Sequence, residues 1–152
     1  MNIIKNYLEI INSKIEKIRI QGTPNELYDP VNYILNLKSK RVRPILSLLS
    51  YSLFKEDIDK IIEPSIALEF FHNFTLIHDD IMDNADIRRG EDTIHKKWNN
   101  NIGILSGDLL MIFAYKMLEN VEEKTFKKTF QRYNNIAVKV CEGQQYDMNY
   151  EV

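Results

Sequence analysis

The segment from Ile66 to Ile77 constrains the fold of this chain more than any other part of the sequence. Its residues are apolar on nearly every helical face, and the surrounding stretch from about Asp57 to Asp83 continues the pattern as one long helix. A helix that is apolar all round has to be covered on every side by other elements. We therefore expect this helix to lie at the centre of a bundle.

The rest of the chain predicts further helices around this central one. Asp29-Pro30 has the pattern of an N-cap followed by proline at the first helical position. A break is expected just before Pro44, because proline interrupts a helix and restricts the residue before it. With only 5 glycines and 4 prolines in 152 residues, and no useful alternating pattern, the fold class is all-α. Helices are expected over about 2–20, 30–43, 44–54, 57–83, 103–120 and 122–150, and residues 84–101 are expected to be mainly a loop with room for one short helix.

Composition and charge exclude several classes of protein. Lys+Arg 20 and Asp+Glu 22 give a formal net charge of -2, which argues against a general nucleic-acid binder, so no nucleic-acid partner is expected. The single cysteine, Cys141, excludes an intrachain disulfide and favours a reduced, cytoplasmic setting, with the thiol buried as a small apolar group. The N-terminal residues lack the apolar core of a signal peptide. No run of about 18 apolar residues occurs, so no membrane span is predicted.

The central helix ends in carboxylates that conflict with its own electrostatics. Asp79 and Asp83 are four residues apart and so share one helix face, with Asp80 beside them. Their like charges repel, and negative charge near a helix C-terminus opposes the macrodipole by roughly 0.3–1 kcal/mol. A hard divalent cation with oxygen ligands resolves the conflict, and magnesium fits best. The alternative is an acidic helix end that is simply solvated.

Basic residues follow and precede these carboxylates. Arg88 and Arg89 come within the next loop, and guanidinium groups recognise phosphate in a planar, bidentate way. The run from Lys38 to Pro44 lies at the expected helix break, where cationic side chains and backbone N–H groups can converge on an anion. Taken alone, each stretch is better explained as a solvated loop or a basic patch. Together with the carboxylates they indicate a diphosphate site.

Five motifs resemble those of one family, in the family's order and over nearly the whole chain. The stretch from Leu76 to Asp83 looks like the first aspartate-rich motif, Asp-Asp-x-x-Asp, of trans-isoprenyl diphosphate synthases such as farnesyl and geranylgeranyl diphosphate synthases. Arg88-Arg89-Gly90 matches the arginine pair that follows it. The other three are Ser39–Pro44, similar to Gly-Lys-Arg-x-Arg-Pro; Ser106-Gly107-Asp108, similar to the family's Gly-Asp helix start; and Gly143–Asp147, similar to Gly-Gln-x-x-Asp.

The resemblance implies the helical bundle of the isoprenoid synthases and a head-to-tail prenyl transfer. In that reaction isopentenyl diphosphate condenses with an allylic diphosphate, with Mg²⁺ as cofactor. Ionising the allylic carbon–oxygen bond requires a leaving diphosphate whose charge is neutralised by metal and arginine. The carbocation then requires an apolar cavity that excludes water.

The resemblance also implies roles for individual residues. Asp79 and Asp83 would bind the magnesium that bridges the allylic diphosphate, with Asp80 in support. Arg88 would contact the same diphosphate. The isopentenyl diphosphate would be bound by Lys40, Arg43, His72 and Arg89, and the reaction centre would be lined by Gln144 and Asp147.

Product length is expected to depend on Phe74, which lies five residues before Asp79. In the family a bulky side chain near this position floors the product cavity, whereas a small one lets long chains grow. Phe74 followed by Thr75 therefore implies a short product such as farnesyl or geranylgeranyl diphosphate. The alternative is that Phe74 is an ordinary core residue.

Two features depart from the family pattern. Lys38-Ser39 stand where family members usually carry two glycines, which is expected to alter the loop or to weaken the isopentenyl diphosphate site. The family fold is also considerably longer than this chain, and the sequence contains no second Asp-Asp-x-x-Asp motif. Residues 1–152 are therefore interpreted as the N-terminal part of a single polyprenyl synthetase domain.

Two other functions remain open beside the prenyltransferase. One is a non-catalytic short subunit that packs against a complete synthase, although such a subunit has no need of the aspartates and arginines. The other is a class I terpene cyclase, which lacks the second diphosphate site expected at Lys40 and Arg43. Family members are commonly homodimers, so a homodimer or pairing with a longer synthase subunit is expected. Residues 103–120 are a candidate for that surface or for core, and uncovered apolar faces predict oligomerisation or poor solubility.

Overall fold

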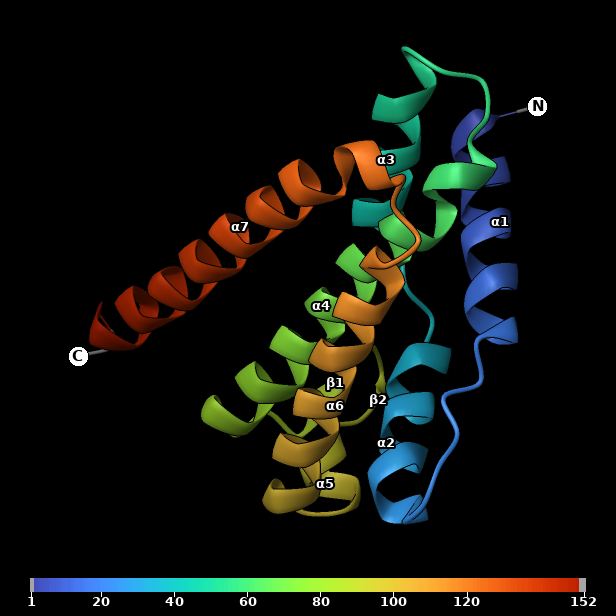
Figure 1. The fold of residues 1–152 in the computed structure, drawn as a ribbon. Coiled ribbons are helices and arrows are strands. Elements are labelled where there is room, and N and C mark those ends of the chain that lie inside the picture. The colour runs from blue at the N-terminus through green and yellow to red at the C-terminus, as the bar shows by residue number, and fades with distance from the viewer. Residues whose placement is uncertain (1, 151–152) are drawn as a thin grey trace. The chain divides into compact units, whose positions relative to one another are not determined.

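The computed structural model describes residues 2–150 and is helical over most of that length (Figure 1). It divides into two compact units, residues 1–120 and 121–152. The first unit contains six helices among its described residues: α1 (Ile3–Lys17), α2 (Asn25–Asn36), α3 (Val42–Ser52), α4 (Asp59–Met82), α5 (Ile94–Lys97) and α6 (Asn100–Leu118). It also contains two short strands, β1 (Ile87–Arg88) and β2 (Glu91–Asp92). The all-α class predicted from the sequence is confirmed.

The central position of α4 is confirmed within the first unit. It packs chiefly against α6 and α3, and Figure 1 shows α4 and α6 side by side. Its apolar core side chains, among them Ile66, Phe70 and Ile77, are at most 2% exposed. The same helix also buries four polar side chains, Ser65, Glu69, Asn73 and Asp80, and the last three bear directly on the site.

Two glycines let α6 approach α4 closely. A Cβ on Gly103 would lie 2.8 Å from Ile81 Cδ1, and one on Gly107 would lie 2.5 Å from His78 Nε2. The helix expected over 103–120 is confirmed, but the Ser106-Gly107-Asp108 motif, which resembles a helix start, lies inside it. The helix begins at Asn100, where the Asn99 side chain accepts the Ile102 N–H as an N-cap. Position 107, in the middle of the helix, is a glycine because the packing against His78 leaves no space for a side chain.

The helix expected to begin at Pro30 begins five residues earlier, at Asn25. Asp29 is therefore not its N-cap. Proline at position 30 deprives the Glu26 carbonyl of its helical N–H partner, but the helix continues through it. Pro30 and Val31 are buried on the inner face, and this burial outweighs the lost hydrogen bond.

The break before Pro44 is confirmed, since α2 ends at Asn36 and α3 begins at Val42. Pro44 lies in the first turn of α3, where a proline costs the helix no internal hydrogen bond. The residue that precedes α3, Arg41, has a φ of 46°, in the left-handed region. This conformation turns the chain between the two helices.

The segment between α4 and α6 contains the expected short helix, α5, and also a hairpin that the sequence did not reveal. Strands β1 and β2 pair antiparallel, with Arg88 opposite Glu91. The two-residue turn between them is Arg89-Gly90, and both residues have positive φ, 57° and 87°, as a type I′ turn requires. Arginine at the first turn position lacks the usual Asn-Gly or Asp-Gly signal, so the hairpin was not predicted.

The second unit contains one long helix among its described residues, α7 (Glu123–Tyr150). It carries Gln144, Gln145 and Asp147, and Gln145 donates to Asn149 Oδ1 at 2.9 Å on the same helix. The expectation that Cys141 is buried is wrong, since the thiol is exposed.

Within residues 2–150, α6 is the helix whose length and apolar composition would suffice to cross a membrane. Length and composition alone are weak evidence, because the core helix of a bundle has the same features. The α6 face that contains Gly103 and Gly107 packs against α4, and the helix contains Asp108 and Lys116. These features fit a bundle helix.

Candidate active site

The acidic end of α4 separates its three aspartates into two environments. Asp80 is 2% exposed, and both Nε and Nη2 of Arg88 donate to its Oδ1, with Nε at 2.9 Å. Asp79 is half-buried and Asp83, the C-cap of α4, is exposed. The pair expected to share a face is therefore more exposed than Asp80, and its charges still act on Arg88.

The electrostatics of this end match the conflict expected from the sequence. Burial and then the charge of Asp83 raise the pKa of Asp79 above its usual range. The hydrogen bond to Asp80 instead raises the pKa of Arg88, which stabilises its charged form. Asp79 and Asp83 thus carry mutually repelling charge, whereas the charge of Asp80 is neutralised.

The donor set fits magnesium. Two carboxylates with hard oxygen donors suit an ion that takes its other ligands from water and phosphate. Within the described part of the chain, no three His, Cys, Asp or Glu side chains converge as a ready-made metal cluster. Asp79 and Asp83 are the available ligands, because Asp80 is already bonded to Arg88. Asp80 as a third ligand stays a prediction.

The hairpin directs its two adjacent arginines to different positions on α4. Arg88 contacts Asp80, whereas Arg89 Nη1 donates to Asn73 Oδ1 at 3.2 Å. Asn73 and Asp80 are seven residues apart, which is roughly 10.5 Å along the axis at 1.5 Å per residue. The type I′ turn thus directs one arginine pair to two separate positions on α4.

A second group of basic side chains surrounds His72. Burial and the charges of Arg43, Arg89 and Arg88 together lower the pKa of His72 to about 4, against the opposing charge of Glu69. Three of the four residues expected to bind isopentenyl diphosphate, His72, Arg43 and Arg89, are therefore close enough to interact. The fourth, Lys40, is exposed on the loop before α3.

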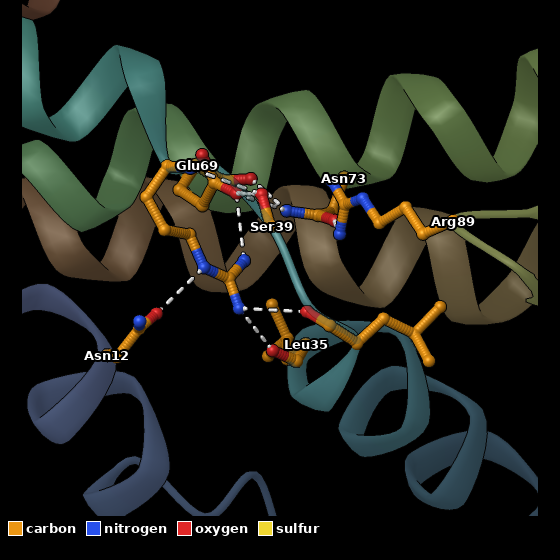
Figure 2. Close-up of polar contacts among 8 residues, drawn as sticks. Asn12, Leu35, Ser39, Glu69, Asn73 and Arg89 are labelled. Carbon is orange, nitrogen blue, oxygen red and sulfur yellow. Dashed lines mark hydrogen bonds and ion pairs between the residues drawn. The ribbon is translucent and has the colours of Figure 1, made fainter. Parts of the chain in front are cut away.

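Beneath this group lies a buried polar network that sequence reasoning missed, which Figure 2 shows. Arg41 is 4% exposed and Glu69 is 1% exposed, and Arg41 Nη1 donates to Glu69 Oε1 at 2.8 Å. Arg41 also donates to Asn12 Oδ1 at 3.2 Å and to the Leu35 carbonyl at 2.6 Å. Asn73, fully buried, donates to the Glu69 carbonyl at 2.7 Å. A glutamate within an otherwise apolar helix was the available signal.

Ser39 joins this network from the loop where the family usually carries glycine. Its hydroxyl donates to Glu69 Oε1 and accepts the Arg41 N–H, both at 3.3 Å. The departure from the family pattern therefore adds two hydrogen bonds to the loop.

Among the aromatic side chains of α4, Phe74 lies between the two charged groups along the helix. The Phe74 ring lies 4.8 Å from the His78 ring, edge-on, and 5.4 Å from the Phe71 ring. Thr75 Oγ1 donates to the His72 carbonyl at 2.8 Å. Phe74 is half-buried, so part of its surface remains available to line a cavity.

The remaining predicted residues and the cavities lie elsewhere. Gln144 and Asp147 are on α7, in the second unit. A cavity of about 620 Å³ lies between α1 and α2, and its lining includes none of the predicted site residues. A smaller cavity of about 360 Å³ borders the buried network at Ser39 and Arg41.

Known proteins with similar sequences belong to one enzyme family. Residues 24–152 match the polyprenyl synthetase family. The chain is 37% identical over 151 residues to a geranylgeranyl pyrophosphate synthase of Geoglobus acetivorans, covering 98% of this chain and 47% of that protein. It is 36% identical over 148 residues to a short chain isoprenyl diphosphate synthase of Methanocaldococcus jannaschii, covering 97% and 45%.

Solved structures give the same result. A crystal structure of a geranylgeranyl pyrophosphate synthase matches with a TM-score of 0.95 and 43% identity, covering 100% of this chain and 46% of that one. A geranylgeranyl pyrophosphate synthetase from Pyrococcus horikoshii matches with a TM-score of 0.90 and 33% identity, covering 97% and 46%. The chain spans about half the length of the curated relatives it matches. The chain belongs to the polyprenyl synthetase family and has the all-α fold of about half an isoprenoid synthase.

Proposed function

We propose that this chain forms part of a prenyltransferase, which condenses isopentenyl diphosphate with an allylic diphosphate in isoprenoid biosynthesis. The product would be short, such as farnesyl or geranylgeranyl diphosphate. Support comes from the family match and from relatives that are named as geranylgeranyl and short-chain synthases. We also propose a cytoplasmic location, which the single exposed thiol suits.

One observation carries this proposal: the hairpin directs Arg88 and Arg89 to two positions on α4 that are seven residues apart. A single-diphosphate enzyme such as a terpene cyclase needs one such position. Two separated cationic positions along one helix suit two diphosphate substrates. The ring of Phe74, which lies between them along the helix and next to Phe71, suits the apolar chains that must meet there.

Each group of residues then has a distinct task. Asp79 and Asp83 would bind magnesium, which when bound neutralises charge on the departing allylic diphosphate. Arg88 would add a hydrogen bond to the same leaving group as the allylic carbon–oxygen bond breaks. The double bond of isopentenyl diphosphate then attacks the allylic cation to form a carbon–carbon bond, and the released diphosphate takes the proton that the resulting cation loses. That second substrate would be bound by Lys40, Arg43, His72 and Arg89, and Gln144 and Asp147 would line the reaction centre.

Phe74 would limit the length of the product. Its ring is half-buried one turn before His78, so a growing chain that runs along α4 would meet it. Product analysis of Phe74→Ala tests this role, and longer products are expected. Unchanged chain length would make Phe74 an ordinary core residue.

A second candidate is a subunit that pairs with a longer synthase. One relative, 32% identical over 137 residues, is named heptaprenyl diphosphate synthase component 2 of Geobacillus stearothermophilus. That name describes a synthase assembled from components. Homodimerisation is the simpler arrangement, and copurification with a longer homologue would favour the two-component one.

The experiment that tests the prenyltransferase is an assay with radiolabelled isopentenyl diphosphate, an allylic diphosphate and magnesium. The wild-type chain is run beside Asp79→Ala, and calorimetric binding of isopentenyl diphosphate is measured in parallel with Arg43→Ala. Product that disappears with Asp79→Ala supports the enzyme. Binding that depends on Arg43 without turnover favours the subunit. Neither binding nor turnover contradicts both.

A further inference from the structure

The buried network around Glu69 touches the predicted site residues but has no part in the binding steps above. Glu69, Arg41 and Asn73 are 1%, 4% and 0% exposed. Burying an ion pair is costly, because desolvation often offsets the whole Coulombic gain. Stability alone therefore explains the network poorly, whereas a requirement for one fixed geometry explains it well.

The network fixes the loop that carries Lys40. Glu69 Oε1 accepts from the Ser39 hydroxyl at 3.3 Å and from Arg41 Nη1 at 2.8 Å. The two residues that flank Lys40 are thus bonded to one carboxylate oxygen. Arg43 follows two residues after Arg41, in the first turn of α3, so its position is also set by this anchor.

The network also fixes Arg89, through Asn73. The Asn73 amide nitrogen donates to the Glu69 carbonyl at 2.7 Å and to Glu69 Oε1 at 3.3 Å. Both contacts orient the amide so that its oxygen accepts from Arg89 Nη1 at 3.2 Å. Figure 2 shows the resulting chain of bonds from Asn12 to Arg89. One glutamate therefore joins two cationic segments that are far apart in the sequence.

We propose that Glu69 and Asn73 are positioning residues: Glu69 places the loop bearing Lys40 and Arg43, and Asn73 aims Arg89 at the same diphosphate. The proposal rests on the diphosphate site described above. It adds residues that do not touch the substrate and act through others. Arg43 and Arg89 both depress the pKa of His72, which agrees with both side chains lying close to one position.

A double-mutant cycle on pyrophosphate binding tests the Asn73 step. Calorimetry on the full chain compares the wild type, Asn73→Ala, Arg89→Ala and the double variant, with inorganic pyrophosphate as the probe. Asn73→Ala is expected to weaken binding about tenfold, the effect of one hydrogen bond to a charged group. The double variant is expected to bind no more weakly than Arg89→Ala. Equal losses in both backgrounds would overturn the proposal, because Asn73 would then act independently of Arg89.

A ligand-free measurement separates this proposal from the proposed function. The His72 pKa, followed by NMR titration, reports on the charges around the ring, which come from Arg43 on α3, Glu69 on α4 and Arg88 and Arg89 on the hairpin. If Asn73→Ala releases Arg89, the pKa of His72 rises. In a chain that already carries Arg89→Ala, Asn73→Ala is then expected to cause no further rise in this pKa. An unchanged pKa overturns the positioning role. A wild-type chain that does not bind pyrophosphate contradicts the diphosphate site but leaves this readout decisive.

Two further variants control for folding. Asn36→Ala removes an exposed amide that donates to the Asn32 carbonyl on α2, and it is expected to change neither affinity nor the His72 pKa. Ser39→Ala removes one loop hydroxyl and leaves the helices intact, so it tests the Glu69 anchor should Asn73→Ala fail to fold. A severalfold loss of pyrophosphate affinity is expected, and wild-type affinity would count against the anchor.

Discussion

Two acidic positions on α4 use the same residue types for opposite purposes. Near the middle of the helix, Glu69 and Arg41 are both almost fully buried and bonded to each other. At the C-terminal end, Asp79 and Asp83 are half-buried and exposed, and each faces another carboxylate. The first pair leaves no charge for a ligand, whereas the second leaves two negative charges without a cation between them.

The difference shows that burial and pairing, rather than residue type, separate framework from site. Asp80 makes the point within one motif, since it is adjacent to Asp79 yet bonded to Arg88 and 2% exposed. A carboxylate with a buried partner fixes geometry. A carboxylate beside another carboxylate is stabilised by a ligand that supplies positive charge.

Removing the buried acid should have the largest effect. Glu69→Ala leaves Arg41 as an uncompensated buried cation and is expected to lower the unfolding free energy by about 3–5 kcal/mol in urea titrations. Glu63→Ala is the matched control, because Glu63 pairs with Lys14 where both side chains are about a third exposed. That change should cost about 1 kcal/mol or less. Similar losses of unfolding free energy for the two variants would mean that Glu69 contributes no more to the fold than a surface ion pair does.

Packing at the acidic end is tested by a substitution at Gly107, and a substitution at Gly143, on α7, is the control. A Cβ at Gly107 meets the His78 ring, which is bonded to the Ile104 carbonyl at 3.2 Å, so Gly107→Ala should destabilise the fold by roughly 1–3 kcal/mol. A Cβ at Gly143 meets nothing within 4 Å, so Gly143→Ala should be neutral or stabilise its helix by about 1 kcal/mol. Thermal unfolding followed by circular dichroism measures both. A stable Gly107→Ala variant would mean that α6 does not constrain this end.

The charge at the acidic end predicts a response to magnesium. Mg²⁺ at several times its Kd should raise the unfolding free energy of the wild type by about 1 kcal/mol. Asp83→Asn should abolish that gain, and without magnesium it should be neutral or slightly stabilising, because it removes a like-charge pair. Asp86→Asn, which removes an exposed charge paired with Lys96, should keep the magnesium response. Equal responses from both variants would show that the ion binds elsewhere.

The remaining prediction concerns the pH dependence contributed by His72. Its folded pKa is depressed to about 4 from 6.5, so between these values the unfolded chain binds the proton and the folded chain does not. The stability contributed by neutral His72 is therefore present above pH 6.5 and lost as pH falls toward 4. Urea titrations across this range should show a steeper fall for the wild type than for His72→Gln. Parallel curves would mean that His72 titrates normally in the folded chain.

Much of the fold could be predicted from the sequence because helix periodicity is local. The central helix was visible in the spacing of its apolar residues, and the break before Pro44 in the proline itself. The start of α2 and the β hairpin were not. In α2, burial of Pro30 overrides the local proline signal, and in the hairpin the turn residue Arg89 adopts a φ that its side chain does not favour.

The candidate site divides in the same way. Spacing placed Asp79 and Asp83 on one face and made the arginine pair recognisable. It gave no reason to distinguish Arg41 from Arg43, two residues away. In the structure one is buried against Glu69 and the other is exposed near His72.

The sequence by itself determined the helices, the order of the motifs and the family, because each depends on residues a few positions apart. Only the tertiary structure decided which acid pairs with which arginine, since Arg41 and Glu69 are 28 residues apart and Arg89 and Asn73 are 16 apart. Such choices depend on how helices pack and what that packing excludes from water. The same packing leaves Asp79 and Asp83 to carry the charge that a ligand would neutralise.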